Sequence, residues 1–120
     1  MTLDQIQLQA IERACGSRFS IINGGAGTGK TTIIRNIVER LEGEGEIVNL
    51  CAPTGKAAAR LREATHHPSW TIHRMLSYNG VRFMAGSLKG ETVIADESTM
   101  IDIHLMNEIM SRSPERLILV

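Results

Sequence analysis

One glycine-rich segment constrains the fold more than any other feature of this 120-residue chain. Residues 24–31 read GGAGTGKT and match the pattern G-x-x-x-x-G-K-[ST] at every position. A short apolar run at 19–22 precedes the segment, and an amphipathic stretch with an isoleucine-rich stripe follows it. The pattern arises by chance about four times in a thousand chains of this length. We therefore predict a strand, a tight loop and a helix in direct succession.

This loop has the chemistry of a phosphate-binding segment. Its glycines allow backbone N–H groups to converge on phosphate oxygens, and the helix that begins near Gly29 adds its dipole. We expect the Lys30 ammonium to bridge the β- and γ-phosphates of ATP and the Thr31 hydroxyl to bind Mg²⁺. The remaining predicted nucleotide contacts in the loop are Gly25, Ala26, Gly27, Thr28 and Gly29.

An acidic pair, Asp96 and Glu97, follows a second apolar run at 92–95. Mg²⁺ prefers oxygen ligands, so we expect Asp96 to hold the metal through its water shell. Glu97 would orient and deprotonate an attacking water, which is the role that separates hydrolases from kinases. Alone, the pair would be an ordinary helix start with Ser98 and Asp102 as caps. Together with the glycine-rich loop it indicates nucleotide hydrolysis, and we take Lys30 and Glu97 as the catalytic residues.

The rest of the chain alternates short apolar runs with amphipathic stretches, which predicts an α/β fold of three layers, α/β/α, around a mainly parallel central sheet. Thr2-x-x-Gln5 predicts a capping box for a first helix that ends at Gly16. Tyr78 to Phe83 contains Asn-Gly between strand-forming residues and predicts a short hairpin. Buried strands are expected at 19–22, 46–52, 92–95 and 117–120, and further helices from Gly29 to Gly43 and at 56–64, 71–76 and 102–111.

Charge is unevenly distributed although the chain has 13 basic and 13 acidic residues. Residues 53–90 carry six basic side chains and one acidic one, whereas 91–120 carry two basic and six acidic ones. The basic region is either a footprint for an anionic partner such as nucleic acid or a solvated helix face. We expect the large aromatics Trp70 and Tyr78 in a core or an interface rather than against DNA.

Composition excludes several classes of protein. With 42% hydrophobic residues and a mean hydropathy of −0.04, the chain has no apolar run near the roughly 20 residues that span a membrane. The N-terminus has no secretory signal pattern, so we expect a cytoplasmic protein with no membrane partner. Cys15 and Cys51 stand singly, and we expect buried structural thiols rather than a metal site or disulfide.

These motifs resemble the RecD-like DNA helicases of superfamily 1, which translocate 5′ to 3′. The stretch 3–11 resembles their Q motif, which implies that Gln7 contacts adenine, and their first motif extends the nucleotide contacts to Thr32. Residues 52–61, APTGKAAARL, resemble motif Ia, and 71–74 resemble the family's T-I-H-R segment. The resemblance implies that Thr54, Lys56 and His73 contact single-stranded DNA. Residues 96–100, DESTM, resemble the family's D-E-x-S-M motif.

The resemblance implies a P-loop NTPase of RecA-like fold in which residues 1–120 form a single ATP-binding domain. It also implies that the strand at 117–120 lies between the strands at 19–22 and 92–95. The chain is expected to stop before the G-D-x-x-Q motif and before the second RecA-like domain. That second domain, and other subunits of a helicase–nuclease complex, are its expected protein partners. Two alternatives stay open: a P-loop phosphotransferase, and a non-catalytic module that binds nucleotide or DNA.

Overall fold

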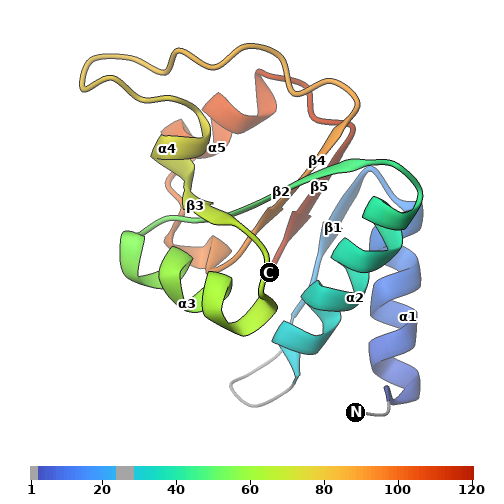
Figure 1. Ribbon diagram of the computed structural model, residues 1–120. Helices are drawn as coiled ribbons and strands as arrows, with labels where there is room; N and C mark the ends of the chain where they lie inside the picture. The colour runs from blue at the N-terminus through green and yellow to red at the C-terminus, as the bar shows by residue number, and fades with distance from the viewer. Residues whose placement is uncertain (1–2, 24–28) are drawn as a thin grey trace.

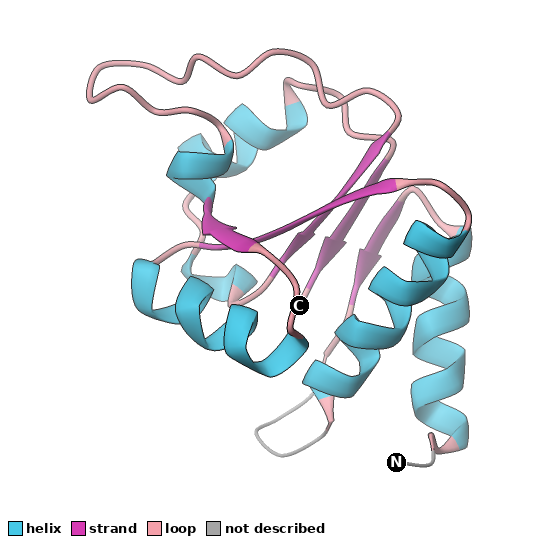
Figure 2. Cartoon of the chain, in the orientation of Figure 1, coloured by secondary structure: helices cyan, strands magenta, loops and turns pink. Residues whose placement is uncertain are grey.

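A parallel β-sheet forms the centre of the molecule (Figures 1 and 2). The computed structural model describes residues 3–23 and 29–120. The described strands of this sheet all pair in parallel, and their order is β1-β5-β4-β2-β3, so the predicted place of the last strand between β1 and β4 is confirmed. The strands are β1 Phe19–Ile21, β2 Ile47–Ala52, β3 Ser69–Thr71, β4 Glu91–Ala95 and β5 Arg116–Leu119.

Helices cover both faces of the sheet, which gives the predicted α/β/α layers. One face packs against α1, α2 and α3 through Ile11, Ile37 and Leu61, and the other packs against α4 and α5 through Ile72 and Ile109. None of the helices in the described ranges has the length and apolar character needed to cross a membrane. The helices are α1 Gln5–Gly16, α2 Lys30–Gly43, α3 Gly55–Thr65, α4 Ile72–Met75 and α5 Ile103–Met110, with a 3-10 turn, η1, at Ser98–Met100.

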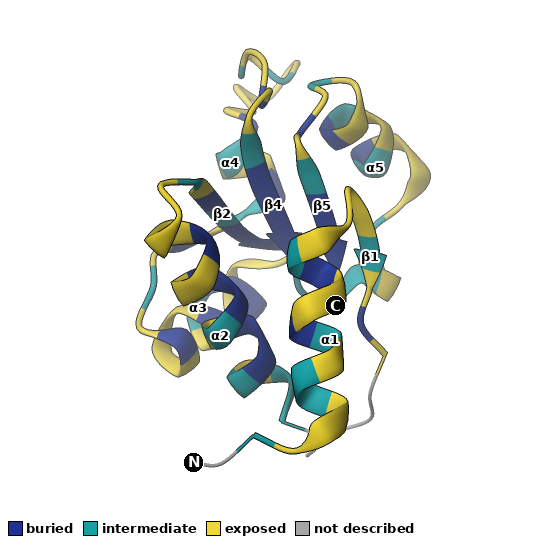
Figure 3. Cartoon of the chain, turned by 90° about the vertical axis from the view of Figure 1, so that its right-hand side faces the viewer, coloured by how far each residue is buried: buried dark blue, intermediate teal, exposed yellow. Residues whose placement is uncertain are grey.

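The central strands read as continuous apolar runs because both of their faces are buried. In β4, Val93 and Ala95 face the α4/α5 side, while Ile94 faces the α1/α2 side, and all three are 0% exposed. β5 follows the same pattern with Leu117 and Ile118. Figure 3 shows these two strands as the most deeply buried part of the sheet.

The prediction of a fully buried first strand is wrong. β1 lies at the edge of the sheet and pairs only with β5 among the described strands. Phe19 and Ile21 are 52% and 58% exposed. Both side chains point to the α4/α5 face of the sheet, and α5 covers that face only over strands farther from this edge. An apolar run identifies a strand in the sequence, but it does not reveal whether a neighbour covers that strand.

Two other local predictions are corrected. The capping box of α1 uses Asp4 and Gln7 rather than Thr2 and Gln5: the Asp4 carboxylate accepts from the Gln7 amide at 2.7 Å, and the Gln7 side-chain oxygen accepts from the Asp4 amide at 3.1 Å. Thr2 lies outside the described residues. The three-residue strand β3 was not predicted, because it is too short to produce a periodic pattern.

The predicted hairpin at 78–83 is confirmed in reduced form. Tyr78 and Phe83 form one antiparallel bridge, and the Asn79 amide donates to the Arg82 carbonyl at 3.1 Å. The hairpin belongs to a long connection between α4 and β4 that projects from the sheet in Figure 1, and Val81 at its tip is 84% exposed.

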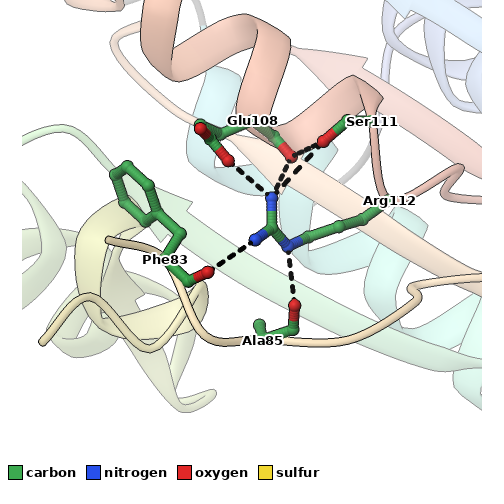
Figure 4. A network of polar contacts seen from close by, with 5 residues as sticks. All are labelled: Phe83, Ala85, Glu108, Ser111 and Arg112. Carbon is green, nitrogen blue, oxygen red and sulfur yellow. Dashed lines mark hydrogen bonds and ion pairs between the residues drawn. The ribbon is translucent and has the colours of Figure 1, made fainter. Parts of the chain in front are cut away.

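Arg112, just after α5, fastens this connection to the body of the domain (Figure 4). Its guanidinium donates to the backbone carbonyls of Phe83 at 3.2 Å and Ala85 at 3.0 Å, and it pairs with the Glu108 carboxylate at 2.8 Å. The Arg112 side chain is only 11% exposed. The connection is therefore held in place at its base while its tip stays in solvent.

Candidate active site

The predicted site residues gather at one edge of the sheet. Lys30 begins α2, Thr54 follows β2, His73 follows β3 and Asp96 follows β4, and Asn23, which was not predicted, follows β1. Because all the strands are parallel, their carboxyl ends meet at the same edge, which is where open α/β sheets bind ligands. The sequence thus supplies the parts of one site from four separated segments.

The end of the glycine-rich loop begins α2. Gly29 has φ 79, a left-handed conformation that glycine adopts without strain, and Lys30 is the first residue of the helix. Thr31 on the first turn is exposed, and Lys30 and Thr32 are half-buried. The predicted contacts Gly25, Ala26, Gly27 and Thr28 lie outside the described residues.

Gln7 lies against the same helix start. A Cβ placed on Gly29 would collide with the Gln7 amide nitrogen, so the two residues are in close contact. The Gln7 side-chain oxygen is already an acceptor in the capping box of α1. The capping box therefore fixes the Gln7 amide beside the end of the glycine-rich loop, with its nitrogen facing Gly29.

Lys30 and Glu97, the two predicted catalytic residues, line one cavity of about 500 Å³. Their proximity is not evident from the sequence, because every element from α2 to β4 lies between them along the chain. An ammonium group and a carboxylate therefore border the same space, which lies between β1, α2 and the turn after β4. Its other lining residues are Ile21, Ile22, Asn23, Ser98, Thr99, Met100 and Val120.

Asp96 lies at the junction of β4 and β2. Its amide donates to the Cys51 carbonyl at 2.9 Å, and its carboxylate accepts from the Glu97 amide at 2.9 Å. Burial, and next the negative charge of Asp96, raise the pKa of Cys51 to about 12. Cys51 is thus the buried thiol that was expected, whereas Cys15 is only partly buried. The carboxylate and hydroxyl oxygens of Asp96 and Thr31 are the hard donors that Mg²⁺ prefers.

Glu97 has an unusual backbone and an ionic partner. Its φ of 52 is left-handed, a conformation that costs free energy for a residue other than glycine and that concentrates at functional sites. One Glu97 carboxylate oxygen lies 3.3 Å from the guanidinium of Arg60 on α3. The Glu97 side chain is 39% exposed and that of Arg60 is 64% exposed, so solvent reaches this ion pair.

The predicted DNA contacts lie on α3 and α4, next to the cavity-lining turn. The Thr54 hydroxyl caps α3 by accepting from the Ala57 amide at 3.1 Å. Lys56 is exposed on the first turn of α3, which contains no acidic residue, so its charge adds to the positive end of the helix dipole. His73 is exposed on α4 and has its ring within 5.2 Å of the Tyr78 ring and 5.3 Å of the Phe83 ring, centroid to centroid.

Two aromatic side chains that we expected in a core or an interface do not lie in the core. Trp70 and Tyr78 are each 43% exposed, so the core placement is wrong for both. The Arg74 guanidinium lies 5.0 Å from the centre of the Trp70 ring, an interaction between a cation and a π-system. The basic region of the sequence thus contains at least one exposed pair of a cationic and an aromatic side chain.

Sequence reasoning missed the role of Arg60. It lies in the basic stretch and in the segment that resembles motif Ia, but nothing in the sequence pairs it with a carboxylate 37 residues away. Asn23 and Met100 in the cavity wall were also missed. Their proximity depends on strand order, which residue types alone do not reveal.

Several known proteins are similar to this chain in sequence or in fold. Residues 7–120 match the model of a family described as AAA domain. The ATP-dependent RecD2 DNA helicase of Deinococcus radiodurans is 36% identical over 93% of this chain and 16% of that protein. The RecBCD enzyme subunit RecD of Mycobacterium tuberculosis is 32% identical over 95% of this chain and 25% of that protein. The chain therefore spans a quarter or less of the length of these relatives.

A crystal structure of the Pif1 helicase from Candida albicans has the same fold, with a TM-score of 0.73 at 20% identity over 99% of this chain and 32% of that chain. The strand order, the glycine-rich loop and this likeness together identify a RecA-like P-loop fold. The chain belongs to the AAA domain family, and the RecD-type DNA helicases are among its relatives.

Proposed function

We propose that these 120 residues form a single ATP-binding domain, the first motor domain of a 5′–3′ DNA helicase of the RecD type. The observation that carries the proposal is the cavity shared by Lys30 and Glu97 at the carboxyl edge of the sheet. The names of the relatives, which include ATP-dependent DNA helicases, support the same substrate pair of ATP and DNA. A cytoplasmic setting is part of this proposal, because ATP and DNA occur together there in bacterial cells.

In this proposal the predicted site residues divide the work of hydrolysis. Lys30 and the loop residues Gly25 to Gly29 bind the phosphates, Thr32 extends these contacts, and Gln7 contacts adenine. Thr31 and Asp96 would hold Mg²⁺, which neutralises charge on the phosphate oxygens.

Glu97 takes the proton of the attacking water. As the oxygen of that water bonds to the γ-phosphorus, the bond from this phosphorus to the β–γ bridging oxygen breaks, and ADP leaves with the electron pair. The Lys30 ammonium offsets the negative charge that develops during this step. Both side chains border the same cavity, which supports a role for both at one bound nucleotide.

Thr54, Lys56 and His73 form the proposed track for single-stranded DNA. An exposed lysine at a helix start and an exposed imidazole beside two aromatic rings supply phosphate contacts and stacking. Translocation and unwinding would require a second RecA-like domain that closes over ATP, and other subunits of a helicase–nuclease complex are further proposed partners. An arginine finger from such a partner accelerates hydrolysis about 10³- to 10⁵-fold in related reactions.

The test measures two affinities of the 120-residue chain and its variants: for a fluorescent ATP analogue with Mg²⁺, and for a fluorescent single-stranded oligonucleotide. We expect Lys30→Ala to weaken nucleotide binding by about tenfold or more, because it removes a charge-assisted contact to phosphate. Lys56→Ala should leave nucleotide affinity within about twofold and should lower the dependence of DNA affinity on salt concentration by roughly the 0.7 expected for one phosphate contact.

Circular dichroism would establish that both variants are folded. Turnover of Mg²⁺-ATP by the isolated domain should stay close to that of Lys30→Ala. Nucleotide affinity that is unchanged in Lys30→Ala, or rapid ATP turnover by the isolated domain without any partner, would overturn the proposed roles of these residues.

A further inference from the structure

We propose that Arg60 is a positioning residue that couples single-stranded DNA to Glu97. In the absence of DNA its guanidinium holds the Glu97 carboxylate, and a DNA phosphate bound along α3 takes Arg60 away and releases that carboxylate for its role as a base. The inference rests on the proposed function, because it assigns Glu97 to hydrolysis and α3 to DNA. It adds a physical link between the two sites.

The first support is the geometry of the pair. Arg60 lies in the middle of α3, which follows β2, and Glu97 lies in the turn after β4. β2 and β4 are neighbours in the sheet, with Cys51 opposite Ala95, so both side chains start from the same edge. The Arg60 nitrogen is 3.3 Å from the Glu97 oxygen. This contact joins the helix of the proposed DNA track to the wall of the proposed nucleotide cavity.

The second support is the mobility that the contact allows. The Glu97 backbone is held at both ends, because its amide donates to the Asp96 carboxylate at 2.9 Å and its carbonyl accepts from the Met100 amide at 3.0 Å as the N-cap of η1. Only the Glu97 side chain has to rotate for the carboxylate to leave Arg60. The carboxylate and guanidinium are 39% and 64% exposed, and an exposed ion pair is weak enough for a competing phosphate to replace it.

The third support is the position of Lys56. Lys56 and Arg60 are four residues apart on α3, so their side chains lie on the same face of the helix. A strand whose phosphate contacts Lys56 therefore runs past the Arg60 guanidinium. Arginine suits this exchange, since its planar guanidinium binds carboxylate and phosphate with the same pair of donors.

A double-mutant cycle of DNA affinity tests the coupling directly in the 120-residue chain. If Glu97 competes with DNA for Arg60, Glu97→Gln frees the guanidinium and raises the affinity for single-stranded DNA by about threefold. In an Arg60→Ala background the same Glu97→Gln change should give a much smaller gain. A merely structural role for Arg60 does not produce this dependence of one substitution on the other.

Glu115→Gln is the matched control, because Glu115 is an exposed carboxylate directly before β5, at the edge of the sheet opposite to the site, whereas a carboxylate on α3 such as Glu63 lies within one helical turn of Arg60. Removing its charge also favours DNA, but its gain should be the same in the parent chain and in the Arg60→Ala background. Arg60→Lys provides a second background in case Arg60→Ala fails to fold: it keeps the charge but loses the planar fork, and the gain from Glu97→Gln should fall between the other two.

The outcomes separate this inference from the proposed function. Equal gains from Glu97→Gln in both Arg60 backgrounds, with Lys56-dependent DNA binding intact, would overturn the coupling and leave the proposed function standing. Absence of any DNA binding by the folded chain would overturn the proposed DNA track and the coupling together. A gain from Glu97→Gln that requires Arg60, alongside a gain from Glu115→Gln that does not, is the result that supports the link.

Discussion

Replacing Arg112 by methionine should detach the long connection between α4 and β4 from the domain. The guanidinium is 11% exposed and donates to two carbonyls of this connection, those of Phe83 and Ala85, as well as to Glu108. Methionine keeps an apolar stem of similar length, so the substitution removes chiefly the hydrogen bonds and the charge.

The expected loss is about 3 kcal/mol. A hydrogen bond to a charged group contributes roughly 1.5–3 kcal/mol, and breaking a buried ion pair costs about 3–5 kcal/mol. The lower end applies, because the Glu108 side chain is 40% exposed and water can rehydrate both it and the freed carbonyls. Urea unfolding of a domain of this size has a slope of about 2 kcal/mol per molar, so the midpoint should fall by about 1.5 M.

Arg62→Met is the matched control for this prediction. Arg62 is an exposed arginine whose guanidinium donates to one carbonyl, that of Ser69, at 3.0 Å. Its replacement should cost about 1 kcal/mol and lower the urea midpoint by about 0.5 M. Hydrogen exchange adds a local measurement: in Arg112→Met the amides of Met84 and Ala85 should exchange faster. A midpoint shift no larger than that of the control, with unchanged exchange at these amides, would refute the anchoring role.

Two further predictions concern the site. Gly29→Ala should weaken nucleotide binding at least about tenfold, because Gly29 has φ 79 and the new Cβ would meet the Gln7 amide. Gly43→Ala is the control: Gly43 has open space around it, so this variant should bind nucleotide normally and gain up to about 1 kcal/mol of stability. The pKa of Cys51 is raised from 9.0 to about 12, so between these pH values the folded protein keeps the thiol proton while the unfolded chain loses it. The contribution of Cys51 to stability is therefore complete below pH 9 and is lost as pH rises toward 12. Urea unfolding at about pH 8 and about pH 10 should show a loss of about 1.4 kcal/mol per pH unit above 9 that Cys51→Ala lacks, and equal losses in both proteins would contradict it.

Most of the fold could be predicted because the central strands and the helices carry strong local patterns. β4 and β5 are apolar at successive positions, and α2 has a regular stripe, so their identities follow from spacing. The order of β1, β5 and β4 came from resemblance to a family, since spacing does not determine which strands are neighbours. β3 and the exposure of β1 escaped prediction, because a three-residue strand has no period and an edge position depends on the remaining strands.

The same distinction applies to the candidate site: residues within motifs could be predicted, whereas a contact that depends on strand order could not. Lys30 and Glu97 were identified from motifs because nucleotide chemistry requires particular residue types beside a glycine-rich loop. Arg60 escaped because its significance comes from a partner 37 residues away that only the adjacency of β2 and β4 brings within reach. In a parallel sheet, segments that are remote in sequence end at one edge, and a charged side chain on the helix after one strand can contact the turn after the next. The ion pair between α3 and the turn after β4 is therefore a consequence of strand order, and strand order also brings the helix that we propose to bind DNA next to the proposed nucleotide site.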